Sequence, residues 1–165
     1  MPPETDNLKL QELFEEDQQD RAKVYDTKES VEQLNSRDGA RRKRLLVMME
    51  LDEIKTKSDL YHAAVVFQHG STSSDFLVAH RLSTLAALNG HRTARWLMAA
   101  SLDRYLMSVR QGQIYGTQFE YNSESKEYEL KLPVQDPIIL SFEKEMLGIP
   151  SVKERLKQLN AQIQK

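Results

Sequence analysis

The sequence predicts a mainly α protein: a compact helical bundle of antiparallel helical hairpins with one small C-terminal β-hairpin. Two observations predict this fold class. From residue 59 to residue 109, apolar residues recur at helical spacing in three segments separated by Gly70 and Gly90. After Gly112 this period stops, and residues 119–121 and 128–132 alternate between apolar and polar about a polar turn, which is typical of a hairpin.

The chain has 165 residues, enough for one domain with one hydrophobic core. We expect a single helical domain over residues 1–165, with residues 1–7 and 161–165 frayed because both ends are polar. The net charge of −2 attracts neither nucleic acid nor an anionic membrane surface, so neither partner is expected. The absence of cysteine excludes disulfides, thiolate metal sites and cysteine nucleophiles.

Targeting signals are also missing from the pattern. The first residues hold neither a basic region nor an apolar run, so no secretory signal is predicted. No apolar stretch approaches the length of a membrane span. We therefore expect a soluble, cytoplasmic protein.

The first helix is predicted from Leu10 and Leu13, with one of residues 5–7 as its N-terminal cap. Asp17 and Arg21 continue the stripe that these leucines begin, which places a charged pair on a face that otherwise packs against the protein. The alternative is an exposed pair four residues apart, which adds only a few tenths of a kcal/mol to the helix.

The next segment is harder to assign because residues 24–39 are charged and weakly periodic. We predict part helix and part loop there, with a turn at residues 35–39. Helical spacing resumes at residues 41–50, whose first residues are basic. A turn follows, and Ser58 or Asp59 is predicted to cap the next helix.

Three helices are predicted in the centre of the chain, at residues 59–69, 75–89 and 93–109. The first is apolar nearly all round, which is typical of a buried helix. In the third, Asp103 falls on an apolar face, and a carboxylate in that position needs a partner. After the hairpin we predict a loop at residues 133–137 and a helix at residues 138–146. Ser151 is expected to cap a last helix that ends near residue 162.

A local likeness to helical repeats suggests one function. Residues 86–94 are similar to the joint of Sel1-like or tetratricopeptide repeats, although no second copy occurs at a fixed period. The alternative function is therefore a helical-repeat-like protein-protein interaction module in which the polar residues are structural.

Several short motifs occur in order along most of the chain, from about residue 10 to residue 159. They are Asp17-Gln18-Gln19-Asp20-Arg21, Phe67-Gln68-His69-Gly70, Asp103-Arg104-Tyr105-Leu106, Tyr115-Gly116-Thr117-Gln118 and Leu147-Gly148-Ile149-Pro150-Ser151. Together they resemble an uncharacterised, mainly bacterial family that is known only as a domain of unknown function. The resemblance implies no activity, cofactor or catalytic residue, but it supports these positions as a candidate site.

We predict that nine polar residues form one pocket between helices, which binds or processes a small anionic or polar molecule. These residues are Asp17, Arg21, Gln68, His69, Asp103, Arg104, Gln113, Tyr115 and Gln118. In an enzyme, His69 would be the general acid or base, Asp103 would orient it, and Arg104 or Arg21 would hold a carboxylate or phosphate. No residue stands in a recognisable nucleophile motif, so covalent catalysis is not indicated.

Two other interpretations of the same residues remain open. The charged pairs can simply tie the first helix and the loop at Tyr115 to the bundle, because buried polar groups need partners in any protein. A metal site built from His62, His69, His80 and a carboxylate would suit zinc, iron or manganese. Its spacing matches no short metal motif, so no metal is predicted and no cofactor is named.

Overall fold

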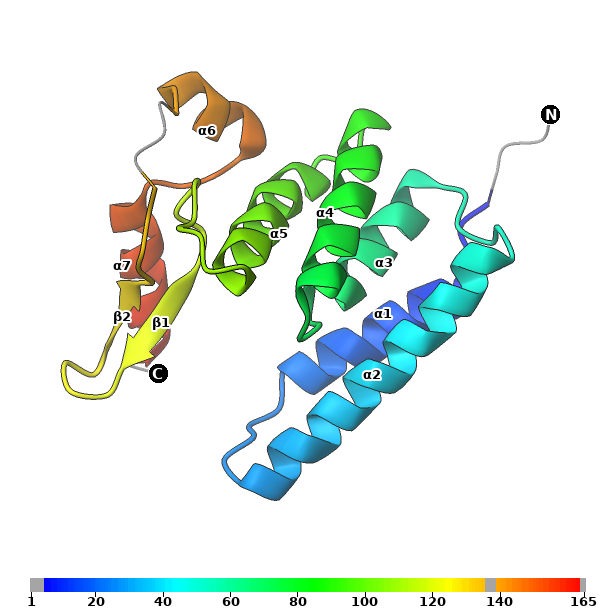
Figure 1. Cartoon of the computed structure of the whole chain (residues 1–165), viewed down its shortest axis with the longest axis horizontal. Helices are drawn as coiled ribbons and strands as arrows, with labels where there is room; N and C mark the ends of the chain where they lie inside the picture. The colour runs from blue at the N-terminus through cyan, green and yellow to red at the C-terminus, as the bar shows by residue number, and fades with distance from the viewer. Residues whose placement is uncertain (1–4, 136–138, 164–165) are drawn as a thin grey trace.

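The computed structural model describes residues 5–135 and 139–163 (Figure 1). Over these residues it contains seven helices and one antiparallel sheet of two strands, so the predicted mainly α fold with a small hairpin is confirmed. The elements are α1 Leu8–Arg21, α2 Lys28–Glu50, α3 Lys57–Gln68, α4 Ser73–Leu88, α5 Ala94–Ser108, β1 Phe119–Asn122, β2 Glu127–Leu130, α6 Ser141–Leu147 and α7 Val152–Ile163.

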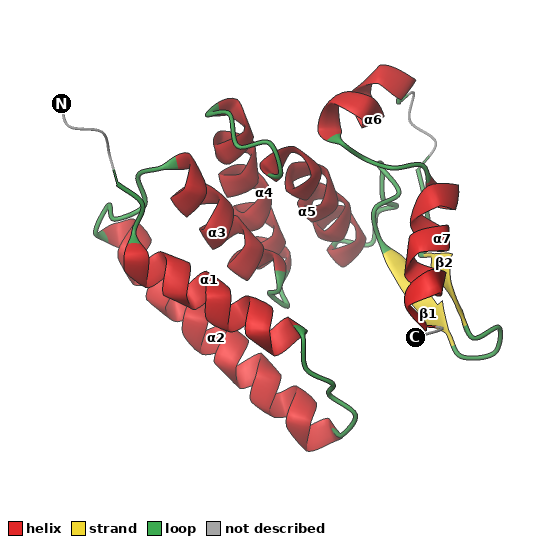
Figure 2. Ribbon diagram, turned by 180° about the vertical axis from the view of Figure 1, so that it is seen from behind, coloured by secondary structure: helices red, strands yellow, loops and turns green. Residues whose placement is uncertain are grey.

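The N-terminal helices lie at one end of the molecule and the C-terminal elements lie at the other (Figure 1). Helices α1 and α2 form a long hairpin at one end, and α3, α4 and α5 pack against one another in succession (Figure 1). The β-hairpin, α6 and α7 lie at the opposite end (Figure 2). The two ends are joined through α5, the loop that follows it and contacts between α5 and α6. No helix in the described part of the chain is both long and apolar enough to cross a membrane.

The hydrophobic core lies mainly around α3, which the sequence predicts to be the buried central helix. Its small and apolar residues pack against apolar side chains of α1, α2, α4 and α5. Within the cluster around α3, the residues with the least exposure are Leu10, Leu45, Ala63, Ala64, Val66, Phe67, Ala79 and Leu97. Alanines at these contacts let the helix backbones approach closely.

The start of α1 is held more firmly than its polar sequence suggests. Asn7, which falls in the segment expected to fray, caps α1 by accepting a hydrogen bond from the Leu10 N–H at 3.2 Å. Its own N–H donates to Asp59 at 2.8 Å, and its side chain donates to the Glu53 carbonyl at 3.1 Å. Asn7 therefore ties the first turn of α1 to the start of α3.

Helix α2 is longer than predicted. It runs without a break from Lys28 to Glu50, so the turn predicted at residues 35–39 is wrong. Thr27 begins the helix with a capping box that includes Ser30. The apolar period is weak because the face toward α1 carries buried charges, and those charges make ion pairs there instead of apolar contacts.

The starts of α3 and α4 follow one pattern. Thr56 caps α3 and Thr72 caps α4, and in each case an aspartate three residues later completes a capping box. The prediction that Ser58 or Asp59 caps α3 is therefore wrong by two or three residues. The Asp59 carboxylate instead accepts hydrogen bonds from the backbone N–H groups of Lys55 and Thr56, beside that of Asn7.

Gly70 lies in the tight turn between α3 and α4. A Cβ atom at this position would lie 2.3 Å from Cβ of Asp75, so no other residue fits without a shift of the turn. The Asp75 carboxylate crosses this space to accept from the N–H groups of Ser71 and Thr72, both at 3.1 Å. The glycine of the Gln68-His69-Gly70 motif is explained by this close approach.

The C-terminal part contains the predicted hairpin and two short helices. Tyr121 lies opposite Tyr128 in the hairpin, and α7 packs against β2. Helix α6 begins at Ser141, inside the segment predicted as a helix, and the side chain of Ser151 accepts from the first turn of α7 as expected. Part of the loop predicted at residues 133–137 lies outside the described residues.

Candidate functional site

The nine predicted site residues do not form one pocket. Six of them are divided between two polar clusters that lie on either side of the end of α3. The other three are Gln68, Arg104 and Tyr115. The N–H of Tyr115 donates to Asp103, and Arg104 donates to Gln118 and to the carbonyl of Gln68. The arginine cluster between α1 and α2 comprises Asp17, Asp20, Arg21, Asp38 and Arg41, with His69 at its edge. The loop cluster after α5 comprises Asp103, Gln113, Thr117 and Gln118.

One buried and one half-buried arginine join α1 to α2 within the arginine cluster. Arg41 donates to Asp20 at 2.9 Å and to Asp38 at 2.5 Å. Arg21 donates to the other oxygen of Asp38 at 2.6 Å and lies 3.4 Å from Asp17, so the predicted pair of Asp17 and Arg21 is part of a larger network. Charge pairs therefore replace apolar contacts along this part of the hairpin.

Asp20 accepts from more cations than any other carboxylate of the arginine cluster. Arg37 approaches it at 2.8 Å and Lys23 at 3.0 Å, in addition to Arg41. Burial disfavours the ionised carboxylate, but the hydrogen bonds from Arg37, Lys23 and Arg41 outweigh this effect and hold the pKa of Asp20 well below its usual range. Asp20 is therefore ionised throughout the physiological pH range.

His69 ends α3 and points its Nδ1 atom at Asp17, with distances of 3.0 and 2.8 Å to the two carboxylate oxygens. The expectation that Asp103 orients His69 is therefore wrong, because Asp17 holds this position. A carboxylate only accepts hydrogen bonds, so Nδ1–H of His69 donates to Asp17. The side chain of His69 is 24% exposed, whereas that of Asp17 is fully buried.

Asp103 is fully buried and is surrounded by donors from a single loop. One of its oxygens accepts from the backbone N–H groups of Ile114 and Tyr115, at 2.7 and 2.9 Å. The other accepts from the N–H and the hydroxyl of Thr117, at 3.0 and 2.7 Å. Asp103 therefore anchors the loop, and neither oxygen is left to orient a histidine or a ligand.

The side chain of Gln113 completes the base of the β-hairpin. It is fully buried, and its amide donates to the carbonyls of Gln118 and Lys131 while its oxygen accepts from the Gln118 N–H at 2.9 Å. Tyr115 contributes only its backbone to this cluster among the described contacts, and burial raises the pKa of its phenol. Gln113 and Tyr115 therefore have structural positions.

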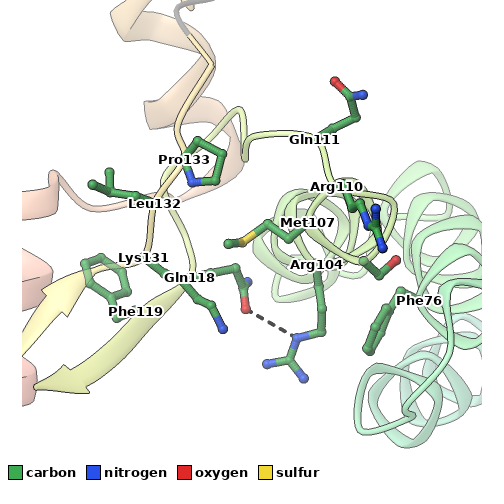
Figure 3. A pocket seen from close by; sticks show the side chains of 11 residues that line it. Phe76, Arg104, Met107, Arg110, Gln111, Gln118, Phe119, Lys131, Leu132 and Pro133 are labelled. Atoms are coloured by element: carbon green, nitrogen blue, oxygen red, sulfur yellow. Dashed lines mark hydrogen bonds between the residues drawn. The ribbon is translucent and has the colours of Figure 1, made fainter.

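Arg104 connects the loop cluster to the end of α3. Its guanidinium donates to the carbonyl of Gln68 at 2.8 Å and to the side-chain oxygen of Gln118 at 3.3 Å, and it lies 5.6 Å from the centre of the Phe76 ring (Figure 3). No carboxylate among the described residues pairs with it. Burial and the nearby positive charge of Arg21 lower the pKa of Arg104.

A groove of about 650 Å³ lies beside Arg104, between α5 and the base of the hairpin. Figure 3 shows Lys131 and Gln118 on the hairpin side of Arg104 and Phe76 on the opposite side. The lining residues include three cations and no acid. They are Phe76, Arg104, Met107, Ser108, Arg110, Gln111, Gln118, Phe119, Lys131, Leu132 and Pro133.

Only Arg104 and Gln118 of the nine predicted residues line this groove. Sequence reasoning missed Phe76, Arg110 and Lys131, which come from three separate segments. Only the position of Arg110 could have been predicted from the sequence. It directly follows the last turn of α5, where a residue in the left-handed conformation commonly ends a helix. Its φ of 63° is in that region, although glycine is the usual residue there.

The histidines considered as metal ligands lie apart from one another. His62 stacks on Phe14 with 4.3 Å between ring centres, and Nδ1 of His80 bonds to the Met98 carbonyl at 2.9 Å. Within residues 5–135 and 139–163, no three histidine or acidic side chains are placed to hold a metal ion. The alternative metal site built on His62, His69 and His80 is therefore not assembled.

Comparison of the chain with family models, with curated proteins and with solved structures finds no match. The resemblance to a family of unknown function stays a prediction. Function has to be inferred from the geometry of the groove and the clusters.

Proposed function

We propose that the groove beside Arg104 binds a small organic anion, namely a carboxylate or phosphate attached to an apolar group. The observation that supports this most directly is Arg104 itself. It is a half-buried guanidinium with no carboxylate partner among the described residues, and it lines a groove whose other charged residues, Arg110 and Lys131, are also cations. An anion would supply the missing counter-charge.

The guanidinium of Arg104 has one nitrogen that is free to bind an anion. Arg104 uses Nε and one terminal nitrogen for Gln118 and Gln68, so its other terminal nitrogen is left to donate to a ligand. An arginine-oxyanion hydrogen bond is charge-assisted and stronger than one between neutral groups. A bound anion would also reduce the repulsion between Arg104 and Arg21.

The apolar part of the ligand is inferred from the remaining walls. Phe76, Met107, Phe119 and Leu132 face the same groove. The volume lies within the range of about 300–1,000 Å³ that is typical of small-molecule sites. Lys131 reaches Glu120 only at 3.9 Å on an exposed surface, and such a pair adds about 0–1 kcal/mol, so Lys131 remains available to a ligand.

Binding is proposed in preference to catalysis because the candidate catalytic residues lie elsewhere. His69 and Asp103 do not line the groove, and Asp103 has no unoccupied oxygen. Among the described residues, no histidine or carboxylate lines the groove, so recognition is the activity that this groove supports best.

Isothermal titration with phenyl phosphate, phenylacetate and inorganic phosphate tests the proposal. We expect phenyl phosphate to bind more tightly than inorganic phosphate, because only the first fills the apolar walls. Arg104→Gln and Arg110→Gln should each weaken binding about tenfold, the effect of losing one charge-assisted contact of about 1.4 kcal/mol.

Arg95→Gln is the matched control. Arg95 is an exposed arginine on the same helix, and it makes no side-chain contact in the described hydrogen bonds or ion pairs. The control should bind like the wild type. Equal affinities of the Arg95, Arg104 and Arg110 variants, or no binding of either aromatic anion at millimolar concentration, would overturn the proposal.

A further inference from the structure

The β-hairpin has two outer edges, and hydrogen bonding between the strands fixes which residues form them. Lys131 N–H donates to the Gln118 carbonyl at 3.1 Å, one residue before the pair of Phe119 and Leu130 with which the register begins. Bonded and non-bonded pairs alternate in an antiparallel sheet. The backbone groups of Phe119 and Tyr121 on β1, and of Tyr128 on β2, therefore point away from the partner strand.

These two edges are treated differently. On β2, the outward N–H of Tyr128 donates to the side chain of Asn160 at 2.7 Å, and α7 packs against this strand. On β1, the outward N–H and C=O groups of Phe119 and Tyr121 have no hydrogen-bond partner among the described residues. One edge is thus covered, and the other is open to pairing with an added strand.

The open edge leads directly into the groove. Phe119 is the first residue of β1 and also lines the groove, next to Gln118 and its contact with Arg104. A strand added to β1 would have one of its ends beside Arg104, Arg110 and Lys131. That end would face three cations and no acid of the groove lining.

We propose that the natural ligand of the groove is the C-terminal carboxylate of an extended peptide that adds to β1 as a third strand. This inference rests on the anion-binding function proposed above. Strand β1 runs away from the groove, from Phe119 to Asn122, so a peptide that ends in the groove pairs antiparallel with it. Phe119 and Tyr121 then each exchange two backbone hydrogen bonds with the peptide.

Charge complementarity indicates which end of the peptide enters the groove. Backbone pairing at β1 is independent of the peptide's sequence, so it supplies affinity without selecting an end. The cations of the groove select the terminal carboxylate, and Phe76 and Met107 offer an apolar surface to the last side chain. The carboxylate and the edge therefore recognise different parts of the same peptide.

Fluorescence anisotropy with a labelled hexapeptide of alternating threonine and valine tests this inference. The peptide is used with a free C-terminal carboxylate and, in parallel, with a C-terminal amide. The free acid is expected to bind at least about tenfold more tightly, because only it pairs with Arg104. Arg104→Gln should remove this preference for the free acid. The control variant Arg95→Gln should keep it.

Variants of Tyr121 test the edge separately. Its N–H points outward, so Tyr121→Pro removes a donor to the added strand without removing a bond of the hairpin. Tyr121→Ala removes the same ring and keeps the N–H. We expect the proline variant to bind the peptide about tenfold more weakly than the alanine variant. Proline removes one hydrogen-bond donor, and its ring occupies space at the edge. Far-UV circular dichroism checks that both variants keep the fold.

The outcomes separate the two proposals. Equal binding of the acid and the amide, or equal affinity of the proline and alanine variants, overturns strand addition. If phenyl phosphate binds through Arg104 while the hexapeptide does not bind at millimolar concentration, the peptide inference fails and the anion site stands. If neither probe binds, both fail.

Discussion

The arginine cluster and the loop cluster both bury carboxylates, but they satisfy them with different donors. Asp103 accepts four hydrogen bonds, all from uncharged groups of one loop. Asp20 and Asp38 accept from the charged side chains of residues on two helices. The first arrangement fixes the conformation of a short segment, and the second fixes the distance between two long elements.

The clusters also differ in how completely they are satisfied. The Nε atoms of Arg21 and Arg41 are buried without an acceptor among the described residues, whereas every polar side-chain atom of Asp103 and Gln113 is bonded. A buried ion pair gains little if part of it stays unpaired, because the desolvation cost is then only partly offset. We therefore expect the loop cluster, whose hydrogen bonds are complete, to stabilise the fold more than the arginine cluster, which has more charges.

The largest effect is expected from Asp103→Asn. The amide has the shape of the carboxylate but replaces one acceptor oxygen by a donor that faces N–H groups, and each unsatisfied buried donor costs about 1–3 kcal/mol. We predict a loss of about 3–4 kcal/mol in the free energy of unfolding, measured by urea denaturation.

The matched control for this measurement is Asp26→Asn, the same change at an exposed residue, which should stay within about 0.5 kcal/mol of the wild type. A loss below about 1 kcal/mol for Asp103→Asn would mean that the loop is held by other contacts.

A smaller effect is expected from Asp20→Asn. Lys23 and Arg37 lie at the exposed side of the cluster, so water can replace part of what they lose, while Arg41 stays buried beside the new amide. We predict a loss of about 2 kcal/mol in the same assay. A loss greater than that of Asp103→Asn would reverse the ranking of the two clusters.

The smallest effect is a difference in pH dependence. The pKa of Asp20 is lower in the folded chain than its unfolded value of about 4, so its contribution is complete above that pH and is lost as the pH falls below it. Between about pH 5 and pH 3, the melting temperature of the wild type should therefore fall more steeply than that of Asp20→Asn. Parallel curves for the two proteins would show that the ion pairs of Asp20 contribute nothing.

Local patterns predicted much of the fold. The apolar period of α3, α4 and α5 and the alternation of the hairpin were sufficient, because these elements bury a regular apolar face. Helix α2 was predicted to be broken because Asp38 and Arg41 occupy its buried face. Apolar periodicity assigns charged residues to the exposed face of a helix. For the same reason, the sequence did not decide whether Asp17 and Arg21 are buried or exposed.

The candidate site was harder to predict. The need of Asp103 for a partner followed from its position on an apolar face, but its partners are backbone N–H groups, which carry no sequence signal. Phe76, Arg110 and Lys131 meet only because α4, α5 and the hairpin are folded together. The spacing of these residues along the chain does not show that they are close in space.

The inserted side chain of Gln113 makes the hairpin depend on a residue outside its strands. Strand pairing at the hairpin base includes an amide that lies outside both strands, so the hairpin has no complete set of hydrogen bonds by itself. The loop that carries Gln113 to this place is held against α5 by its hydrogen bonds to Asp103. The register of the hairpin should therefore depend on α5, and the hairpin should not keep this register once it is separated from the helices.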